Sequence, residues 1–388
     1  MIKEEVKGFR DIKGYEAKAR EWVKSIIIKN FRVWGFEPAE TPIVEYENFV
    51  KGENSSDEAV SDIFKLKDKG DRELALRYEF TFQLKRLVNN QKLPYKRYQI
   101  GEVFRDEPIS ANRYRQFTQC DADIVGSTIK DEADILALTT KIFTELGIKI
   151  AIKVNNRKLL NEIMQSEKIK EEDRMQVIKE IDKLDKLTEK EVKENLKKYK
   201  AENLLDIFKK PESFFEKYKA YSEVQELQKY CNFYGINFEF SPTLARGLSY
   251  YNGTIFEFKS KEMKETIGAG GAYLVNDIQS IGVSFGLDRV SQLATKLNHT
   301  ERGVVIVSLG QDEEAIKIMQ KLREKGILSE LWGGKGLSKA LEYANSYNMP
   351  YVIFIGEEEL KQKKVKLKNM MTGKEELIDE GKLIKELE

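Results

Sequence analysis

The chain has 388 residues, enough for two or three domains, and 41% of them are hydrophobic, enough for a substantial core. Lysine and arginine number 66 against 65 aspartate and glutamate residues, so the overall charge predicts neither nucleic-acid nor membrane binding. The single histidine, His299, and the absence of a CxxC motif exclude zinc sites of ordinary spacing and any mechanism that needs two imidazoles.

The composition also limits where the protein works. No apolar run approaches the ~18 residues of a membrane-spanning helix, and the N-terminal stretch lacks the apolar region of a signal peptide. Cys120 and Cys231 are far apart in the chain and belong to no pairing motif, which suits a reducing compartment. We therefore expect a cytoplasmic protein without membrane contacts.

Residues 1–160 mix helical and strand patterns. Residues 16–31 have helical spacing, with Trp22, Ile26 and Ile27 on one face. The region therefore predicts a domain in which helices pack against a sheet.

Within this region, residues 95–126 form two strand-like runs around the polar loop 108–112. On the first run, Val103, Arg105 and Glu107 share one side; on the second, alternation places Gln119, Asp121 and Asp123 opposite the apolar Cys120, Ala122 and Ile124. Three polar residues on one face of a strand are costly to bury unless they line a wet site or a ligand.

Arg105 and Arg113 bracket the loop of this hairpin. Two guanidiniums and the Glu107 carboxylate on a rigid hairpin suit a polyphosphate and its counter-charges. The alternative is an exposed hairpin held by salt bridges. The chain has no P-loop sequence, and the glycine-rich run 269–273 matches no dinucleotide fingerprint, so we expect that run to be a close-packed strand.

Residues 161–235 form a Lys- and Glu-rich helical segment inside strand-rich sequence. Thr188 and Glu191 have the spacing of a capping box, which predicts the start of a helix. Apolar residues recur at helical intervals on both sides of this box: Val177, Ile181, Leu184, Val192, Leu196 and Tyr199. The segment is predicted to be an inserted helical module, with strand patterns resuming at about residue 236.

The stretch LARGLSYYNGTIFE places Arg246, Tyr250 and Tyr251 next to an Asn252-Gly253 pair. An Asn-Gly pair suits a type I′ turn and predicts a hairpin with residues 248–251 and 254–258 as its strands. A plain hairpin and a functional arginine beside a bend are both compatible with this pattern.

From about residue 303, strand patterns alternate with helical patterns, which predicts a small α/β domain with a largely parallel sheet. The expected strands are 304–309, 327–331 and 351–355, and the expected helices are 312–325 and 337–348. The polar linker 298–302 precedes this domain, and we expect His299 within it to be an exposed loop residue.

In the run KKVKLK, Lys364, Lys366 and Lys368 alternate with Val365 and Leu367. A strand here would place three cations on one face and two apolar groups in the core. The two interpretations are a local phosphate-binding patch and a solubilising edge strand whose lysines prevent aggregation. Residues 301–388 carry 15 basic and 16 acidic residues, so only local clustering favours the first.

Several of these segments together resemble the class II aminoacyl-tRNA synthetases, in the histidyl form. Residues 105–107, 113–117, 119 and 121–126 are similar to the second motif of that class, residues 282–289 to the third, and Thr41-Pro42 to the first. Arg246-Gly247-Leu248 with Tyr250-Tyr251 resembles the motif specific to histidyl-tRNA synthetases, and residues 7–11 and 77–81 also fit. The resemblance spans nearly the whole chain.

The resemblance implies an α+β fold. The class II antiparallel-sheet catalytic domain is expected at residues 1–160 and 236–298, with a helical insertion at 161–235. A C-terminal α/β anticodon-binding domain is expected at 303–388. The first motif implies a homodimer that forms through the region around Pro42.

The implied activity is the ATP-dependent activation of histidine to histidyl-adenylate and its transfer to the terminal adenosine of tRNA(His), with ATP and Mg²⁺ as cofactors. The resemblance assigns catalysis to Arg246 and Arg105, with Arg246 reaching the α-phosphate and the amino-acid carboxylate. It assigns ATP binding to Arg105, Glu107, Arg113 and Arg289, and histidine binding to Glu79, Thr81, Gln119, Asp123, Arg246, Tyr250 and Tyr251. We expect tRNA binding at Lys364, Lys366 and Lys368, and no protein-bound metal site.

Two alternatives remain on the same fold: a histidyl synthetase-like regulatory subunit of ATP phosphoribosyltransferase, and a non-catalytic RNA-binding sensor. The regulatory subunits typically lack the ATP-site arginines and the C-terminal domain, both of which this chain has. The chain departs from the family pattern at Ser249, Pro108 and Ala272. We expect Ser249 to affect the support of Arg246, and the other two to lie in loops near ATP and the tRNA acceptor end.

Overall fold

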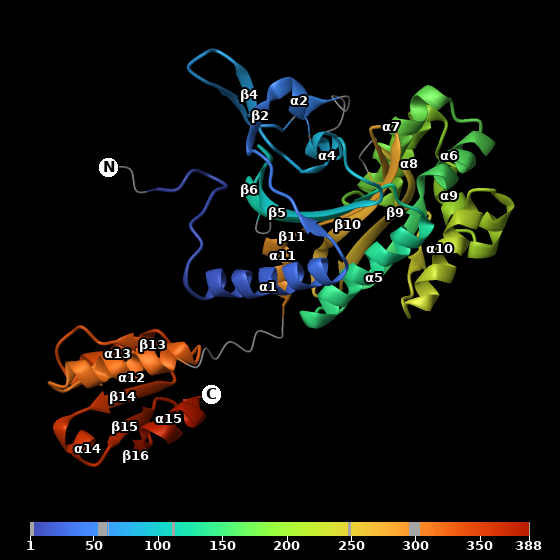
Figure 1. The fold of residues 1–388 in the computed structure, drawn as a ribbon. Helices are drawn as coiled ribbons and strands as arrows, with labels where there is room; N and C mark the ends of the chain where they lie inside the picture. The colour runs from blue at the N-terminus through green and yellow to red at the C-terminus, as the bar shows by residue number, and fades with distance from the viewer. Residues whose placement is uncertain are drawn as a thin grey trace. The chain divides into compact units, whose positions relative to one another are not determined.

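The computed structural model describes residues 4–52, 60, 62–110, 113–246, 250–294 and 303–387. The expectations for Ser249, for His299 and for the linker 298–302 lie outside these residues. The chain divides into two compact units, residues 1–297 and residues 298–388 (Figure 1).

The first unit is built on an eight-stranded sheet with the order β1-β5-β6-β11-β10-β9-β7-β8. Its strands are β1 Glu37–Pro38, β5 Tyr95–Phe104, β6 Gln116–Val125, β7 Ala151–Asn156, β8 Glu239–Phe240, β9 Tyr251–Ser260, β10 Met263–Val275 and β11 Ile278–Gly286. The edge pairs β1–β5 and β7–β8 are parallel, and the five pairs between them are antiparallel. This confirms the predicted α+β class with an antiparallel sheet.

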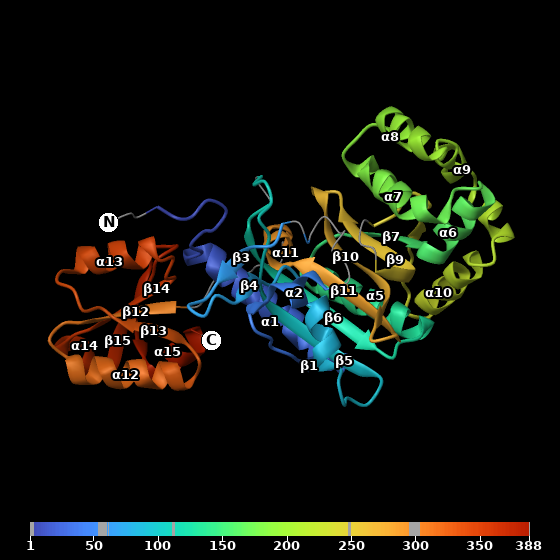
Figure 2. The same cartoon turned by 90° about the horizontal axis from the view of Figure 1, so that it is seen from above.

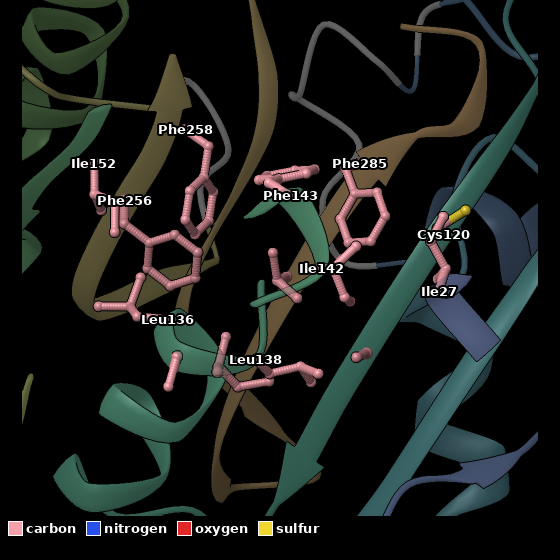
Figure 3. Close-up of a cluster of buried hydrophobic side chains, with 14 of the residues drawn as sticks. Ile27, Cys120, Leu136, Leu138, Ile142, Phe143, Ile152, Phe256, Phe258 and Phe285 are labelled. Carbon is pink, nitrogen blue, oxygen red and sulfur yellow. The ribbon is translucent and has the colours of Figure 1, made fainter. Parts of the chain in front are cut away.

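Three helices cover one face of this sheet: α1 Gly14–Val33, α5 Ile129–Glu145 and α10 Tyr221–Phe233 (Figure 1). Figure 3 shows Phe143 of α5 between Phe258 of β9 and Phe285 of β11, with ring centroids 5.5 and 5.4 Å away. Ile27 of α1 and Cys120 of β6 belong to the same core, as the helical and strand periodicities predicted. The opposite face of the sheet is therefore left for polar groups.

Smaller elements lie along the polar face. A three-stranded sheet has the order β2-β4-β3. Its strands are β2 Val44–Tyr46, β3 Lys65–Lys67 and β4 Glu73–Leu76, and the neighbouring helices are α2 Glu47–Lys51 and α4 Thr81–Leu87. The short helix α11 Leu287–Leu293 follows β11 and packs with α1 in the apolar core instead.

The predicted inserted module is helical. It consists of α6 Arg157–Ser166, α7 Glu171–Asp182, α8 Glu189–Leu196 and α9 Leu204–Phe208, with the 3-10 helices η1 Lys183–Asp185, η2 Lys197–Tyr199 and η3 Glu212–Lys217. The capping box is confirmed: Thr188 N donates to Glu191 Oε2 over 2.8 Å. The module lies beside β7 and β9 (Figure 2), and its apolar residues share one core with Tyr251 and Ile255 of β9.

The predicted Asn252-Gly253 turn is wrong, because both residues lie inside the continuous strand β9. Tyr251 pairs with Tyr273 and Ile255 with Gly271, so β9 contains two extra residues opposite this part of β10. The Asn-Gly pair therefore forms an irregularity of the β-bulge type rather than a turn. The flanking residues hold the chain extended, because Tyr251 pairs with Tyr273 of β10 and Thr254 pairs with Asn156 of β7, and local turn propensity cannot overcome this pairing.

The second unit is a five-stranded sheet with the order β13-β12-β14-β15-β16. Its elements are β12 Gly303–Ser308, α12 Asp312–Glu324, β13 Leu328–Leu331, α13 Leu337–Ser346, β14 Tyr351–Ile355, α14 Glu357–Lys361, β15 Lys364–Asn369, β16 Glu375–Asp379 and α15 Glu380–Leu387. All five elements predicted from the pattern are present.

The expectation of a largely parallel sheet is wrong for half of this unit. β12 is parallel to β13 and β14, but β14–β15 and β15–β16 are antiparallel. Residues 356–363 connect β14 to β15 through the short helix α14. That connection is shorter than the roughly ten to twelve residues that a parallel crossover requires.

Candidate active site

A cavity of about 950 Å³ opens on the polar face of the eight-stranded sheet. This volume is at the upper end of the roughly 300–1,000 Å³ typical of small-molecule sites. Its wall contains four arginines, Arg105, Arg113, Arg246 and Arg289; the carboxylates include Glu79, Glu107, Asp121 and Asp182; and the aromatic side chains include Tyr114, Phe117, Tyr250 and Tyr251.

The β5–β6 hairpin supplies one side of the cavity. Its register pairs Gly101 with Gln119 and Phe104 with Gln116, so the residues between Phe104 and Gln116 project beyond the paired strands. Alternation along β6 then turns Gln119 and Asp121 towards the cavity, while Cys120 enters the core. The predicted division of polar and apolar faces on this strand is confirmed.

Three arginines form a cationic group at one end. Arg105 Nε donates to the Tyr78 carbonyl over 3.1 Å, and its guanidinium lies 5.2 Å from the centroid of the Phe117 ring. Arg289 Nη1 donates to the Thr266 carbonyl over 2.8 Å, and Arg113 forms an ion pair with Glu107.

The electrostatics of this group favour an anionic ligand. Burial lowers the pKa of Arg289, and the positive charges of Arg113 and Arg105 lower it further, although Glu265 opposes them. Guanidiniums close enough to lower one another's pKa repel, and a ligand with several negative oxygens would relieve that repulsion. The arrangement therefore suits a polyphosphate.

Arg246 lies in the same cavity and has an unusual backbone. Its φ of 54° is in the left-handed region, which costs a non-glycine residue of the order of 1–3 kcal/mol. Arg157 Nη2 donates to the Arg246 carbonyl over 2.8 Å, and Arg246 Nη1 donates to Glu257 Oε1 over 2.9 Å. Burial disfavours the charge, but Tyr251 and Glu257 outweigh it and raise the pKa of Arg246.

Glu79, Thr81, Gln119, Tyr250 and Tyr251 also line the cavity, as the resemblance predicted them to gather. The rings of Tyr250 and Tyr251 have centroids 4.8 Å apart. Burial and the charge of Glu79 raise the pKa of Tyr250, so its phenol stays protonated at neutral pH. The pocket therefore combines carboxylates that attract a cationic amine with neutral phenols that can donate hydrogen bonds.

Asp123 is not part of the cavity wall. It is buried beneath the wall, 2.9 Å from Arg97, and accepts a hydrogen bond from the Tyr273 hydroxyl. A Cβ at Gly282 would lie 2.2 Å from Asp123 Oδ1, so a glycine is required there. The structure thus groups Asp123 with an internal network rather than with the residues that face the cavity.

Asp121 does face the cavity, although no role was predicted for it. Its Oδ2 accepts a hydrogen bond from Gln119 Nε2 over 2.9 Å, and its buried Oδ1 has no hydrogen-bond partner among the described residues. Burial and the neighbouring Asp123 raise the pKa of Asp121 to about 7. The signal was present in the alternation, which placed Asp121 on the polar face of β6.

The inserted module supplies a wall of the cavity that sequence reasoning missed. The lining residues from this module are Gln176, Lys179, Asp182, Lys183, Lys186 and Leu187. Lys179, Lys183 and Lys186 recur at i, i+4 and i+7, which is the spacing of one helical face. The spacing predicts that the three lysines share one helical face, but it does not predict what this face contacts.

The three residues that depart from the family pattern, Pro108, Ser249 and Ala272, lie in different environments. Pro108 lines the cavity, and Ser249 is outside the described residues. The expectation that Ala272 lies in a loop is wrong: it is buried in β10 and contributes to the apolar core.

The glycine-rich run 269–273 belongs to the same strand, where a Cβ at Gly271 would lie 2.5 Å from the Thr254 carbonyl oxygen. This confirms the expectation of a close-packed strand.

The lysines of β15 lie in the second unit. Val365 and Leu367 are each 2% exposed, so alternation places the lysines on the opposite face, as predicted. Lys368 Nζ lies 2.9 Å from Glu375, and Lys366 Nζ lies 3.9 Å from Glu359. The edge-strand interpretation is wrong, because β15 pairs with β14 on one side and β16 on the other.

Among the described residues, no three His, Cys, Asp or Glu side chains are grouped so that they could hold a metal ion. The helices of the described part of the chain are all too short or too polar to cross a membrane.

Comparison with known proteins agrees with this geometry. The family model for Histidyl-tRNA synthetase matches residues 8–290, and the model for Anticodon binding domain matches residues 303–388. Histidine–tRNA ligase 1 of Bacillus cereus is 36% identical over 95% of this chain and 96% of its own length. The corresponding protein of Bacillus anthracis is 37% identical over 95% and 96%, and the histidine–tRNA ligase of Clostridium tetani is 31% identical over 94% and 93%.

Solved structures have the same fold. The histidyl-tRNA synthetase of Nostoc sp. PCC 7120 superposes with a TM-score of 0.87 at 26% identity, covering 100% of this chain and 99% of that one. A protein from Bacillus halodurans, described as an ATP phosphoribosyltransferase regulatory subunit/histidyl-tRNA synthetase, shares the fold with a TM-score of 0.76 at 21% identity, over 91% and 98%. Since family-level matches extend across both units, the chain belongs to the histidyl-tRNA synthetase family.

Proposed function

We propose that this chain activates histidine with ATP to form histidyl-adenylate and pyrophosphate, and then transfers the histidyl group to the 3′-terminal adenosine of tRNA(His). The observation that carries the proposal is that one cavity holds both a group of anchored guanidiniums and a carboxylate-lined pocket. A polyphosphate and a cationic amino acid therefore fit next to one another.

In the first step, a carboxylate oxygen of histidine attacks the α-phosphorus of ATP, and the bond from that phosphorus to the pyrophosphate oxygen breaks. Negative charge develops on the phosphoryl oxygens. Arg246 and Arg105 stabilise this charge, and they do so without reorganising, because Glu257 and the Tyr78 carbonyl already hold them. Arg289 and Arg113 bind the departing phosphates.

Mg²⁺ would fit this site only when it binds together with the phosphates of the nucleotide. It typically keeps several waters and binds one or two carboxylates together with substrate phosphates. Glu107, which lines the cavity beside Arg113, is the carboxylate placed for this role. The ion would supply further neutralisation of the phosphate charge.

The amino acid binds through its ammonium to Glu79, Thr81 and Gln119. Tyr250 and Tyr251 form the walls around the imidazole, and Tyr251 donates a hydrogen bond to it. Asp123 contributes from beneath the wall by holding Tyr273, whose ring lies 5.5 Å from that of Tyr250. A pocket that satisfies both ring nitrogens rejects apolar amino acids strongly.

The remaining assignments concern the domains and the assembly. We assign the catalytic domain to residues 1–160 and 236–298, the insertion to 161–235 and the anticodon-binding domain to 303–388. In the last of these, Lys364, Lys366 and Lys368 contact the tRNA backbone. A homodimer would form through the region around Pro42, where Ile43, Val44 and Tyr46 are exposed apolar residues. Sedimentation that shows a fully active monomer would contradict the dimer.

The decisive experiment is histidine-dependent ATP–pyrophosphate exchange, followed by aminoacylation with tRNA. Exchange without tRNA and histidylation with tRNA are expected. A regulatory subunit or an RNA-binding sensor on this fold would bind histidine or RNA without either reaction, so loss of both reactions would exclude the proposed function.

A further inference from the structure

The Arg246 guanidinium is held by Glu257 and by the neighbouring Tyr251 side chain. The backbone of Arg246 is in the left-handed region, and its side chain is anchored by the hydrogen bond from Nη1 to Glu257. Its Nε is buried without a hydrogen-bond partner among the described residues. A change in how firmly Glu257 holds the guanidinium would therefore change where Arg246 lies.

Glu257 is shared between Arg246 and a second cation. Its Oε1 accepts from Arg246, while its Oε2 lies 3.1 Å from Lys259 Nζ and 3.1 Å from Thr266 Oγ1. Glu257 and Lys259 alternate on the same face of β9, so the lysine is held next to the carboxylate. Two cations thus share one buried carboxylate, each on its own oxygen.

Lys259 also reaches the inserted module. Its Nζ donates to Asp185 Oδ2 over 3.0 Å, and Asp185 is the last residue of η1, which follows α7 directly. The side chain of Asp185 is 67% exposed. Ion pairs with this exposure contribute about 0–1 kcal/mol, so the contact can break and form again readily.

The same part of the module faces the cavity. Asp182 and Lys183 line it, and Asp182 is near enough to Arg246 to act on its charge. A displacement of this segment would therefore alter the cavity wall and the Asp185–Lys259 contact together.

We propose that Lys259 is a positioning residue that couples the inserted module to Arg246. With the module in place, Lys259 divides its charge between Asp185 and Glu257, and Glu257 holds Arg246 firmly. When the module moves away, Lys259 loses Asp185 and pairs with Glu257 alone, which weakens the hold of Glu257 on Arg246. Adenylate formation then depends on the position of the module. This coupling rests on the proposed function of the cavity.

The test is a pair of charge reversals measured by histidine-dependent pyrophosphate exchange without tRNA. Asp185→Lys repels Lys259 towards Glu257 and is expected to lower kcat about fivefold, within the coupling range of contacting residues. The KM for ATP should change less than about twofold, because Arg105 is anchored on a backbone carbonyl that does not involve Glu257.

Asp206→Lys is the matched control. Asp206 belongs to the same module, is 57% exposed and pairs with Lys193 over 2.9 Å, but it does not line the cavity. It is expected to leave kcat unchanged. Both substitutions are at exposed sites, so thermal unfolding should show folded proteins.

A second comparison isolates Lys259. In a Lys259→Met background, Asp185→Lys is expected to cause no further loss of kcat, and in a Lys259→Arg background the loss should return. The coupling is overturned if Asp185→Lys behaves like Asp206→Lys, or if its effect is the same with and without Lys259. Absence of exchange in the unmodified protein would overturn the proposed function as well, whereas normal exchange with no effect of Asp185→Lys overturns the coupling alone.

Discussion

The two basic regions of this protein differ in how their cations are held. In the cavity, Arg105 and Arg289 are fixed by backbone carbonyls and Arg246 by a buried carboxylate. On β15, the side chains of Lys366 and Lys368 are 39% and 22% exposed, and their acidic partners Glu359 and Glu375 are 16% and 44% exposed.

The two arrangements are suited to different tasks. Charged side chains that are already fixed in place before the reaction stabilise a transition state without a reorganisation cost, so they affect kcat. Half-exposed lysines provide positive charge that neutralises phosphates without reading sequence, so they affect affinity and its salt dependence.

The largest effect is expected for Arg246→Ala. Removing one fixed donor at developing charge costs about 3 kcal/mol, or roughly 10² in kcat for pyrophosphate exchange. Thermal unfolding should stay close to that of the unmodified protein, because the side chain lines a cavity rather than the core. Exchange close to the unmodified rate would remove Arg246 from the catalytic assignment.

Asp123→Ala tests a charge that is buried without facing the cavity. Arg97 is 0% exposed and would lose its carboxylate, so the free energy of unfolding should fall by about 3 kcal/mol. The KM for histidine should rise more than the KM for ATP, since Tyr273 loses its acceptor. An unchanged histidine KM with a raised ATP KM would show that Asp123 supports the nucleotide end instead.

Glu132→Gln tests a buried carboxyl that lacks a close cation. Burial raises the pKa of Glu132 from 4.5 to about 7, and its Oε2 has no hydrogen-bond partner among the described residues. The folded state therefore retains a proton that the unfolded state has released between those two pH values, so this group makes stability fall as pH rises towards 7.

A glutamine side chain does not ionise, so the substitution removes this contribution to the pH dependence of stability. Glu132→Gln is expected to increase the free energy of unfolding by about 2 kcal/mol at pH 8 and by much less at pH 5. Denaturant unfolding at both pH values measures this difference. An equal change at both would mean that ionisation of Glu132 is not the cause.

The smallest effect is expected on β15. Changing Lys364, Lys366 and Lys368 together to Gln should raise the KM for tRNA about tenfold and flatten its salt dependence, because fewer phosphates are neutralised. Pyrophosphate exchange without tRNA should not change. The matched control is the same change at Lys317, Lys321 and Lys325, which removes the same charge on and just after α12. Equal effects of the two triple variants would show that only net charge matters.

Local sequence predicted much of this molecule because short-range physics decides those features. Alternation on β6 separated Cys120 from Gln119, and the capping box at Thr188 began a helix where expected. The five elements predicted in the second unit are also present. Each of these depends on periodicity or on hydrogen bonds within a few residues.

Other features depend on partners that are distant in the chain. Asn252-Gly253 has the local preference of a turn, but the residues on either side of it pair with β7 and β10 and keep it extended. Asp123 shares a strand face with Asp121, yet Arg97 and Tyr273 enclose it beneath the cavity wall. Spacing alone could not separate these two carboxylates, because alternation gives the face but not what lies above it.

The family, the order of elements along the chain and the four arginines of the cavity wall therefore follow from the amino-acid sequence alone. The fold is needed to show that Asp123 lies beneath the cavity wall, that α7 of the inserted module forms part of this wall, and that Lys259 joins the module to Glu257 beside Arg246. The reason is physical: periodicity is a property of consecutive residues, whereas burial, the sharing of a carboxylate and the resulting pKa values depend on groups that only folding brings together.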